Sequence, residues 1–527
     1  MLTTTPTSGS PRDVRESNEP ETLDRQFGFW SACSLGVITG SAWPLFGGTI
    51  VISLYNGGPP GVLYELIAAG IIYTAVSASI AEMASALPSS AGVYYWASIT
   101  GGQRYGRVLG FYAGWLNFFA YVFATIATSS ISANQLVQMY ALFHPDYSYE
   151  RWHTFIAYLA CSCIACLCVI LGHRFLAHIN DLGLFFIVAG VFITVVVCAV
   201  MPSVNGNGYA SSQSVWVDWQ NESGYSSNGF VFLMGMLNGA FALGVPDCIS
   251  HIAEEIANPE RDIPRAIFAQ VATGFFLTFV CLVSIFYATT DLSALANTTS
   301  LFPIATLYQQ ATGSASGTLG LLILIFLPSF WAIIGAYVTA GRMLWTLGRG
   351  NAAPFAKFIG HISAVHHNPL NATLCTAVLN MLLGAIYIGS TTAFSAFVSS
   401  MVCLNLLCYL ATILPHLVSG RTTFPRGVFW MRGWIGTFVH SVTCIYIVVF
   451  MIIFCFPYSM PVTPESMNYS SVIVGGLILA ITVWWFWKRS CGYTGLASGL
   501  LNGIVLEQGG QAGGLALTER TKSKGSE

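Results

Sequence analysis

Two short segments rich in glycine and proline interrupt otherwise apolar stretches of the chain, and each could form a binding site. The first covers residues 39–44 (TGSAWP) and the second covers residues 239–246 (GAFALGVP). Glycine exposes backbone and proline cannot donate a hydrogen bond to the preceding turn, so Pro44 and Pro246 each predict the start of a second half-helix. Ser41 fits the N-cap of the first. Free N–H groups and the dipole at such a start suit a carboxylate ligand.

Two acidic residues lie in apolar surroundings, where a carboxylate needs a physical reason. Asp247 directly follows Pro246, and Glu65 lies a few residues into a separate apolar stretch. A carboxylate near mid-membrane costs about 2.5–3.5 kcal/mol on insertion scales. Asp247 is interpreted as a partner for a cationic substrate group or a proton site, or as a cap for the following half-helix, and both readings stay open. Glu65 either takes part in proton coupling or reaches interfacial water.

Aromatic residues flank both interruptions. The rings of Trp43, Phe46 and Phe241 could pack against a ligand or receive a cation. Aromatic residues make up 14 % of the chain, so ordinary packing is the alternative for each.

The composition requires that a membrane surrounds these residues. Hydrophobic residues make up 54 % of the 527 residues and charged residues 8 %, whereas a soluble globular chain carries roughly 25 % charged residues. A bilayer core needs about 20 apolar residues per helix. Twelve stretches qualify, and the interruptions fall in the first and the sixth. The stretches are 28–53, 61–86, 108–135, 153–171, 177–201, 229–251, 264–289, 318–341, 370–389, 393–418, 434–456 and 470–487.

The positive charges predict the orientation. With a cytoplasmic N-terminus, every Lys and Arg of the 20 in the chain except Arg151 falls on the cytoplasmic side. Both termini are therefore expected to be cytoplasmic. The domains are a disordered tail at 1–27, a twelve-helix domain at 28–488 and a second tail at 489–527. The sequons at Asn221, Asn297 and Asn468 fall in outside loops and are glycosylation candidates.

Other classes of protein and site find little support. The net charge of −2 gives no electrostatic case for nucleic acid, and residues 1–27 contain no apolar signal segment. The run Cys161, Cys163, Cys166 and Cys168 lies among apolar residues without an alternating His or acid, which predicts packing and no metal site. No cofactor is expected.

Five segments resemble one transporter superfamily. They are FALGVPD at 241–247, the stretch 251–264 that includes Glu254 and Glu255, and the segments 82–96, 341–354 and 467–469. Together they resemble the amino acid–polyamine–organocation superfamily, and within it the fungal amino acid/choline transporters, which include GABA and choline permeases. The resemblance implies the inverted five-plus-five repeat of the bacterial leucine transporter, with helices 1 and 6 broken.

The resemblance also implies the site. Substrate would lie between the two breaks, with helices 3 and 8 completing the pocket. An inner gate would form among Arg104, Glu254, Glu255 and Arg342, although ordinary interfacial ion pairing explains the same charges. Gly350 follows Arg349 where an acid is usual. The expected substrate-binding residues are Thr39, Gly40, Ser41, Ala42, Trp43, Phe241, Ala242, Leu243, Gly244 and Asp247.

The sequence therefore predicts an all-α integral membrane protein that transports a small organic solute. The main interpretation is a proton-coupled symporter for an amino acid, GABA, choline or a polyamine, in the plasma or the vacuolar membrane, with Asp247 and Glu65 as the proton-coupling candidates. A transporter-like nutrient receptor is the alternative. An enzyme would need a second cluster of catalytic residues beside His251, Glu254 and Glu255, and none is evident.

Overall fold

The computed structural model describes most of the chain outside its two tails. The described residues are 25–40, 42–292, 300–363, 368–386, 392–464 and 466–496. The predicted Ser41 cap, the Asn297 sequon and most of both tails lie outside these ranges.

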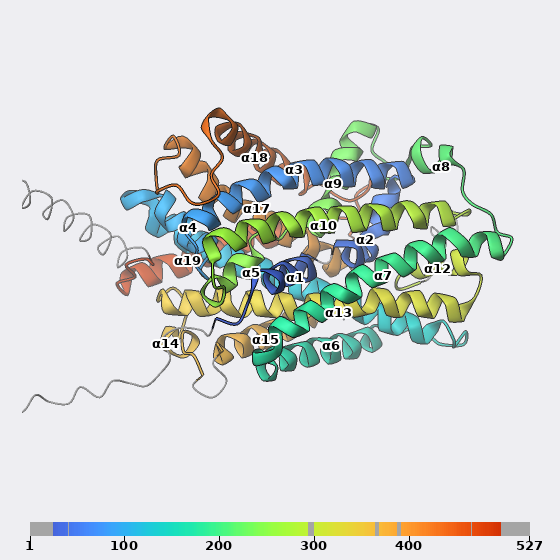
Figure 1. The fold of residues 1–527 in the computed structure, drawn as a ribbon, viewed down its shortest axis with the longest axis horizontal. Coiled ribbons are helices and arrows are strands. Elements are labelled where there is room, and N and C mark those ends of the chain that lie inside the picture. Colours follow the sequence, from blue (N-terminus) through green and yellow to red (C-terminus); the bar gives the residue numbers. More distant parts are fainter. Residues whose placement is uncertain are drawn as a thin grey trace, which may run out of the picture.

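Ten long apolar helices of the described part run along the long axis of the molecule (Figure 1). Each has the length and composition to cross a bilayer. One of them is the helix α9 (Asn228–Leu243) together with the 3-10 helix η2 (Cys248–Glu255). The others are α3 (Gly58–Ala86), α5 (Gly102–Ala141), α6 (Arg151–Leu171), α7 (Leu176–Val204), α10 (Pro259–Ala288), α13 (Ala315–Arg349), α17 (Thr392–Val418), α18 (Gly433–Ile453) and α19 (Ser470–Ser490).

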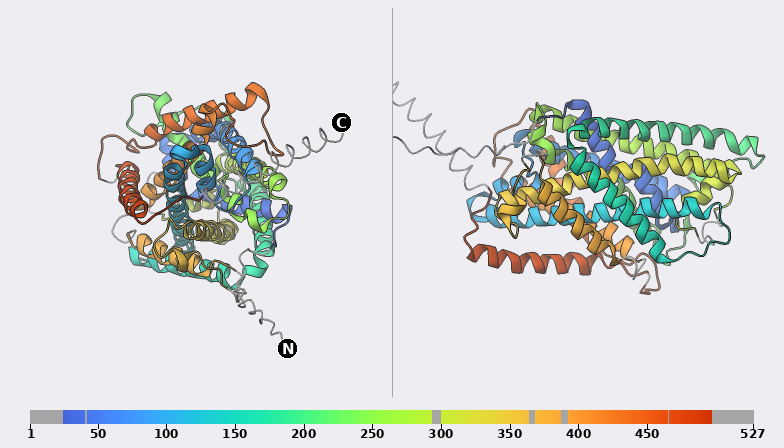
Figure 2. Two further views of the ribbon diagram at one scale, coloured as in Figure 1. Left: turned by 90° about the vertical axis from the view of Figure 1, so that its left-hand side faces the viewer. Right: turned by 90° about the horizontal axis from the view of Figure 1, so that it is seen from below.

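Two of the predicted spans include residues outside the described part of the structure. The span at 28–53 contains α1 (Phe29–Gly40) and α2 (Ala42–Tyr55) on either side of residue 41, and the span at 370–389 contains α15 (Leu370–Gly384) before residues 387–389. The all-α membrane architecture is confirmed, and ten helices of the described residues have the length of a full span. The helix α19 lies at the periphery of the bundle, as the red helix in Figure 2 shows.

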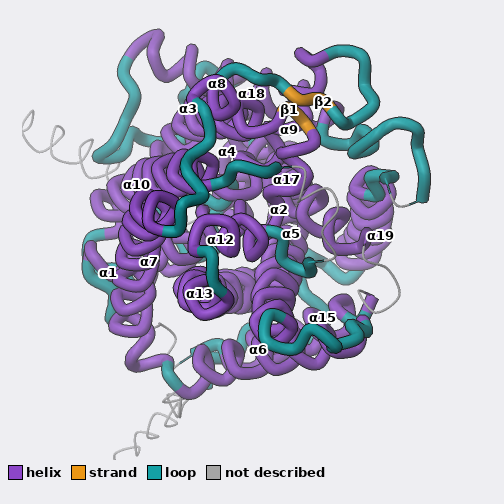
Figure 3. Tube along the Cα trace, turned by 90° about the vertical axis from the view of Figure 1, so that its right-hand side faces the viewer, coloured by secondary structure: helices purple, strands orange, loops and turns teal. Residues whose placement is uncertain are grey.

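Short elements distinguish the two ends of the bundle. At one end lie α8 (Ser212–Trp216), α12 (Ile304–Thr312) and an antiparallel pair formed by β1 (Asn56–Gly57) and β2 (Gln220–Asn221) (Figure 3). We call this the hairpin end. At the opposite end lie α4 (Val93–Thr100) and α14 (Ala356–Ile359) (Figure 1). Arg349 ends α13 here, Lys488 of α19 donates to Asn351 just after α13, and Arg107 donates to the Tyr493 carbonyl just after α19. We call this the basic end.

The structure describes the two predicted interruptions to different extents. Residue 41, between α1 and α2, lies outside the described residues, so the first interruption stays a prediction; Pro44 is the third residue of α2. The second comprises residues 244–247 between α9 and η2. The predicted second half-helix after Pro246 is an eight-residue 3-10 helix and no α-helix. Short 3-10 segments are frequent at helix ends and functional hinges.

The cysteine run of α6 packs inside the bundle. Cys161 and Cys166 are buried, whereas Cys163 and Cys168 are partly exposed, and all four are free thiols. Their neighbours along α6 are mostly apolar, so they fill space as small hydrophobic side chains.

Candidate functional site

Asp247 occupies the second interruption and is completely buried. It stands at the N-cap position of η2, but its side chain makes no capping hydrogen bond there. The interpretation of Asp247 as a helix cap is therefore wrong. Its carboxyl group instead accepts hydrogen bonds from side chains of α5 and α17 and shares one with His251 of η2.

Four side chains surround the Asp247 carboxylate. Oδ1 accepts hydrogen bonds from the hydroxyl groups of Tyr121 on α5, at 2.7 Å, and of Tyr409 on α17. Oδ2 lies 2.9 Å from Nδ2 of Asn117 and 3.2 Å from Nε2 of His251. Asn117 and Tyr121 stand one helical turn apart and so share one face of α5. A buried carboxylate needs such partners, because an isolated charge in a low dielectric is strongly disfavoured.

His251 joins this carboxylate to the loop before α4. Its ring is completely buried, and its Nδ1 lies 3.0 Å from the carbonyl oxygen of Ser90. The Ser90 hydroxyl in turn accepts a hydrogen bond from the backbone N–H of Glu254. The middle and the C-terminal end of η2 are thus tied to the same loop.

The last turn of α1 is closely packed against α13. The Thr39 hydroxyl donates to the carbonyl of Leu35 in its own helix, at 2.8 Å. Gly335 of α13 faces Thr39 so closely that a Cβ there would overlap the Thr39 hydroxyl. Trp43, near the start of α2, is 3 % exposed. Helix 8 of the predicted arrangement, which is α13, therefore contacts the predicted binding residue Thr39.

The remaining predicted binding residues lie at the end of α9, shortly before Asp247 in the chain. Phe241, Ala242 and Leu243 are buried in the last turn of α9, and the Gly244 carbonyl follows them. The Nδ2 of Asn405 and the Tyr409 hydroxyl both lie 3.5 Å from that carbonyl. The side chains of Ser41 and Ala42 are outside the described part of the structure.

Gln270 of α10 connects the end of α1 to the second interruption. Its Nε2 donates to the carbonyl of Val245 at 3.1 Å. The same nitrogen lies 3.2 Å from the position that a Cβ on Gly40 would occupy. Gln270, like Asn117, Tyr121 and Tyr409, was missed by the sequence analysis, because a polar residue within a membrane span carries no local signal of the direction it faces.

Glu65 lies apart from Asp247, on α3 where that helix packs against α9. It is 1 % exposed, and its two carboxyl oxygens have no hydrogen-bond partner among the described residues. Gly235 of α9 faces the carboxyl group so closely that a Cβ there would overlap both oxygens. Glu65 does not reach interfacial water in this conformation, so that alternative is wrong.

Two ion pairs join η2 to α13 at the basic end. The guanidinium of Arg342 makes two hydrogen bonds to the Glu255 carboxylate, one of them 2.9 Å long between Nη2 and Oε2, and both side chains are buried. The Nη1 of Arg349 lies 3.1 Å from each oxygen of Glu254, near the surface. No ion pair among the described residues joins Arg104 to either glutamate; its guanidinium lies over the Tyr105 ring. Arg349 therefore takes the place that was predicted for Arg104.

A further buried cluster ties α3 to α17 and α18. Nη2 of Arg421 lies 2.7 and 2.8 Å from the oxygens of Glu82, and Nε2 of His440 lies 3.2 Å from Oε1. Nε2 of His416 lies 3.8 Å from the same oxygen. Two histidines and a carboxylate have the composition of a metal site, but the Arg421 guanidinium already supplies the cation that the carboxylate needs.

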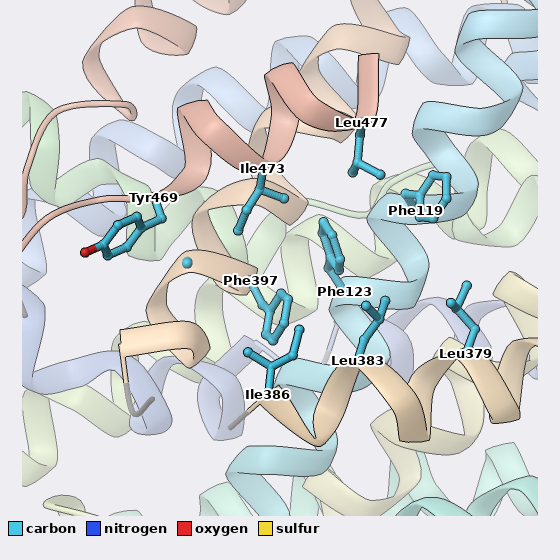
Figure 4. A pocket seen from close by; sticks show the side chains of 10 residues that line it. Phe119, Phe123, Leu379, Leu383, Ile386, Phe397, Tyr469, Ile473 and Leu477 are labelled. Atoms are coloured by element: carbon cyan, nitrogen blue, oxygen red, sulfur yellow. The ribbon is translucent and has the colours of Figure 1, made fainter. Parts of the chain in front are cut away.

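An apolar groove of about 450 Å³ lies between α5, α15, α17 and α19 (Figure 4). Its walls are aliphatic and aromatic, and a phenol is their one polar side chain. A polar solute finds no partners here, so the groove is not the candidate substrate site. The lining residues are Phe119, Phe123, Leu379, Leu383, Ile386, Ala396, Phe397, Tyr469, Ile473 and Leu477.

The two described sequons differ in exposure. Asn221 lies partly exposed in β2 at the hairpin end. Asn468 is 1 % exposed, and its Nδ2 donates to the Phe454 carbonyl at 2.7 Å. A glycan on Asn468 would require this amide to leave its buried position.

Comparison with known proteins identifies the family. The family model described as amino acid permease matches residues 27–478. The chain belongs to this family. A choline transporter of Saccharomyces cerevisiae is 29 % identical over 479 residues, which cover 88 % of this chain and 82 % of the relative. A 7-keto 8-aminopelargonic acid transporter of the same yeast is 23 % identical over 518 residues, covering 88 % of this chain and 92 % of the relative.

A solved structure confirms the fold of this permease. A manganese transporter of Eremococcus coleocola superposes with a TM-score of 0.52 at 13 % identity, covering 90 % of this chain and 99 % of that one. The broken sixth span thus belongs to the inverted five-plus-five repeat that the resemblance implied. The protein is an integral membrane transporter of small organic solutes and no enzyme.

Proposed function

We propose that this permease is a proton-coupled symporter for an amino acid, GABA or a choline-like solute. The solute binds between the two interruptions, and the two repeats rock around it so that the site opens to one side of the membrane at a time. The observation that carries the proposal is the buried Asp247, held by side chains of α5, α17 and η2 where non-helical backbone lies inside the bundle. Non-helical backbone at membrane depth is tolerated where it is buried in protein or lines a cavity.

In this proposal the basic end faces the cytoplasm and both termini are cytoplasmic. The excess of Lys and Arg at that end supports the orientation. The Arg342–Glu255 and Arg349–Glu254 pairs then act as the inner gate, because they hold η2 against α13 on the cytoplasmic side of Asp247. The plasma membrane is the proposed location.

Glu65 is proposed as a second protonation site. A buried carboxylate without a donor is far less favourable than the neutral acid, so the carboxyl is taken to be protonated in this conformation. A change in the distance between α3 and α9 would then alter its access to a proton.

Uptake measurements test the proposal. Cells that lack their own GABA and choline permeases would express the chain, and uptake of labelled GABA, choline, several amino acids and a polyamine would be measured at pH 5 and pH 7.5, with and without a protonophore. We expect saturable uptake of one class that collapses with the protonophore and is lost in Asp247→Asn.

The control is Asp146→Asn, which neutralises an exposed carboxylate in the loop before α6 and should leave uptake unchanged. Uptake that the protonophore does not reduce would refute proton coupling. A correctly localised protein that transports nothing on the panel would favour the receptor instead.

A further inference from the structure

We propose that Asp247 and His251 form one proton-holding unit, which carries a proton in the conformation described here. The inference rests on the proposed proton coupling and assigns the coupled proton to a pair in which His251 is the second member. The sequence analysis considered His251 only together with Glu254 and Glu255, as a cluster too small for the active site of an enzyme.

The contacts of the imidazole decide its protons. Nδ1 lies 3.0 Å from the Ser90 carbonyl oxygen, which can only accept a hydrogen bond, so Nδ1 must carry a hydrogen. Nε2 lies 3.2 Å from Oδ2 of Asp247. A neutral imidazole has one N–H. If that hydrogen is on Nδ1, the lone pair of Nε2 points at a carboxylate oxygen unless a further proton lies between them.

Two arrangements satisfy both contacts. In one, His251 is an imidazolium with two N–H groups and Asp247 is a carboxylate. In the other, Asp247 is a carboxylic acid that donates from Oδ2 to a neutral His251. Both contain one proton more than a carboxylate beside a neutral ring, and both make the pair electrically neutral. The opposite neutral tautomer, with its hydrogen on Nε2, would set the Nδ1 lone pair against the Ser90 carbonyl.

The other neighbours cannot supply the missing positive charge. Facing the pair are Tyr121 from α5, Tyr409 and Cys408 from α17, and Cys248 from η2 itself. All of these are neutral or potentially anionic groups. The Tyr121 ring meets the His251 ring edge-on at 5.5 Å, which closes that side. Arg342 pairs with Glu255 one η2 turn further on, so the proton is the cation that neutralises Asp247.

The pH dependence of stability tests, independently of transport, whether the pair holds a proton in the folded protein. Thermal unfolding of the purified protein in lipid nanodiscs would be followed between pH 5.5 and pH 8.5 for the natural chain, His251→Gln and Asp247→Asn. The double substitution Asp247→Asn/His251→Gln is included because it leaves no unpaired charge, and so folds even if a single substitution does not. His153→Gln, at the start of α6, is the matched control.

A folded state that holds one more proton than the unfolded state loses stability as pH rises. We therefore expect the unfolding temperature of the natural chain to exceed that of the double variant most at pH 5.5. The difference in unfolding temperature should shrink by several degrees as the pH rises to 8.5. The unfolding temperature of His153→Gln should change with pH as that of the natural chain does.

The two outcomes separate the inference from the proposed function. If the unfolding temperatures of the natural chain and the double variant change with pH in parallel, the pair holds no proton, and the inference is refuted even if the protein transports a solute. The expected convergence in a protein that transports nothing on the panel would retain the pair and reject the proposed substrates.

Discussion

At the scale of single residues, the chemistry depends on which hydroxyl groups reach Asp247. Tyr121 and Tyr409 both donate to the same oxygen of this buried carboxylate. A hydrogen bond to a charged group contributes about 1.5–3 kcal/mol. These phenols therefore hold Asp247 in place and adjust how readily it accepts a proton or a cation.

Replacing Tyr409 by phenylalanine tests this contribution. Tyr409→Phe removes one donor while preserving the ring, so we expect the kcat/KM of transport to fall about 10- to 100-fold. Tyr158→Phe is the matched control, because Tyr158 is equally buried but donates to a backbone carbonyl of α15, at Asn380. Equal losses of uptake in both variants, at equal surface expression, would refute a specific role for the phenol at Asp247.

The contact between Glu65 and Gly235 gives a second residue-scale prediction. Gly235→Ala places a methyl group where the Glu65 carboxyl lies, and overpacking of this kind costs about 1–3 kcal/mol. We expect a lower thermal stability for Gly235→Ala and recovery in Gly235→Ala/Glu65→Ala. Gly229→Ala, near the start of the same helix with space around it, should leave the stability unchanged. Without recovery in the double variant, the collision with Glu65 would not be the cause.

At the scale of elements, two ion pairs connect η2 to α13 in different surroundings. Arg342 and Glu255 are buried, whereas Arg349 and Glu254 are 43 % and 29 % exposed. Breaking a buried pair leaves an uncompensated charge and costs about 3–5 kcal/mol, while an exposed pair contributes about 0.2–1 kcal/mol. Arg342→Gln should thus lower the unfolding temperature much more than Arg349→Gln. Equal losses would mean that burial does not distinguish the two pairs.

The sequence predicted these elements unevenly. The second interruption and Asp247 were found because Gly, Pro and an intramembrane carboxylate are local signals. The partners Asn117, Tyr121 and Tyr409 were not found, since α5 and α17 carry many polar residues and only helix packing selects the inward-facing ones. Of the predicted ion pairing, Glu254, Glu255 and Arg342 do form pairs, but the side chain that reaches Glu254 comes from the end of α13 and not from Arg104; their role as a gate stays a prediction.

At the scale of the whole molecule, the orientation in the membrane can be read from one native thiol. Cys491, just after α19 at the basic end, is exposed, whereas the other cysteines of the described residues are buried or partly buried. If the basic end is cytoplasmic, a membrane-impermeant maleimide should label intact cells weakly and permeabilised cells strongly.

Two variants control this labelling. Cys491→Ser should abolish the signal. Asp146→Cys, in the exposed loop before α6, should be labelled in intact cells. Labelling of Cys491 without permeabilisation would reverse the proposed orientation.

The neutral pairing of Asp247 with His251 has an electrical consequence. Moving one elementary charge across a membrane held at 100 mV involves about 2.3 kcal/mol. A carrier that returned with a bare carboxylate in its centre would experience part of that force, whereas one that returns with its proton bound would not. A symporter releases its coupled proton before the empty carrier returns, so the return occurs with the bare carboxylate. The return step should therefore vary with membrane potential, whereas the crossing of the protonated pair should not.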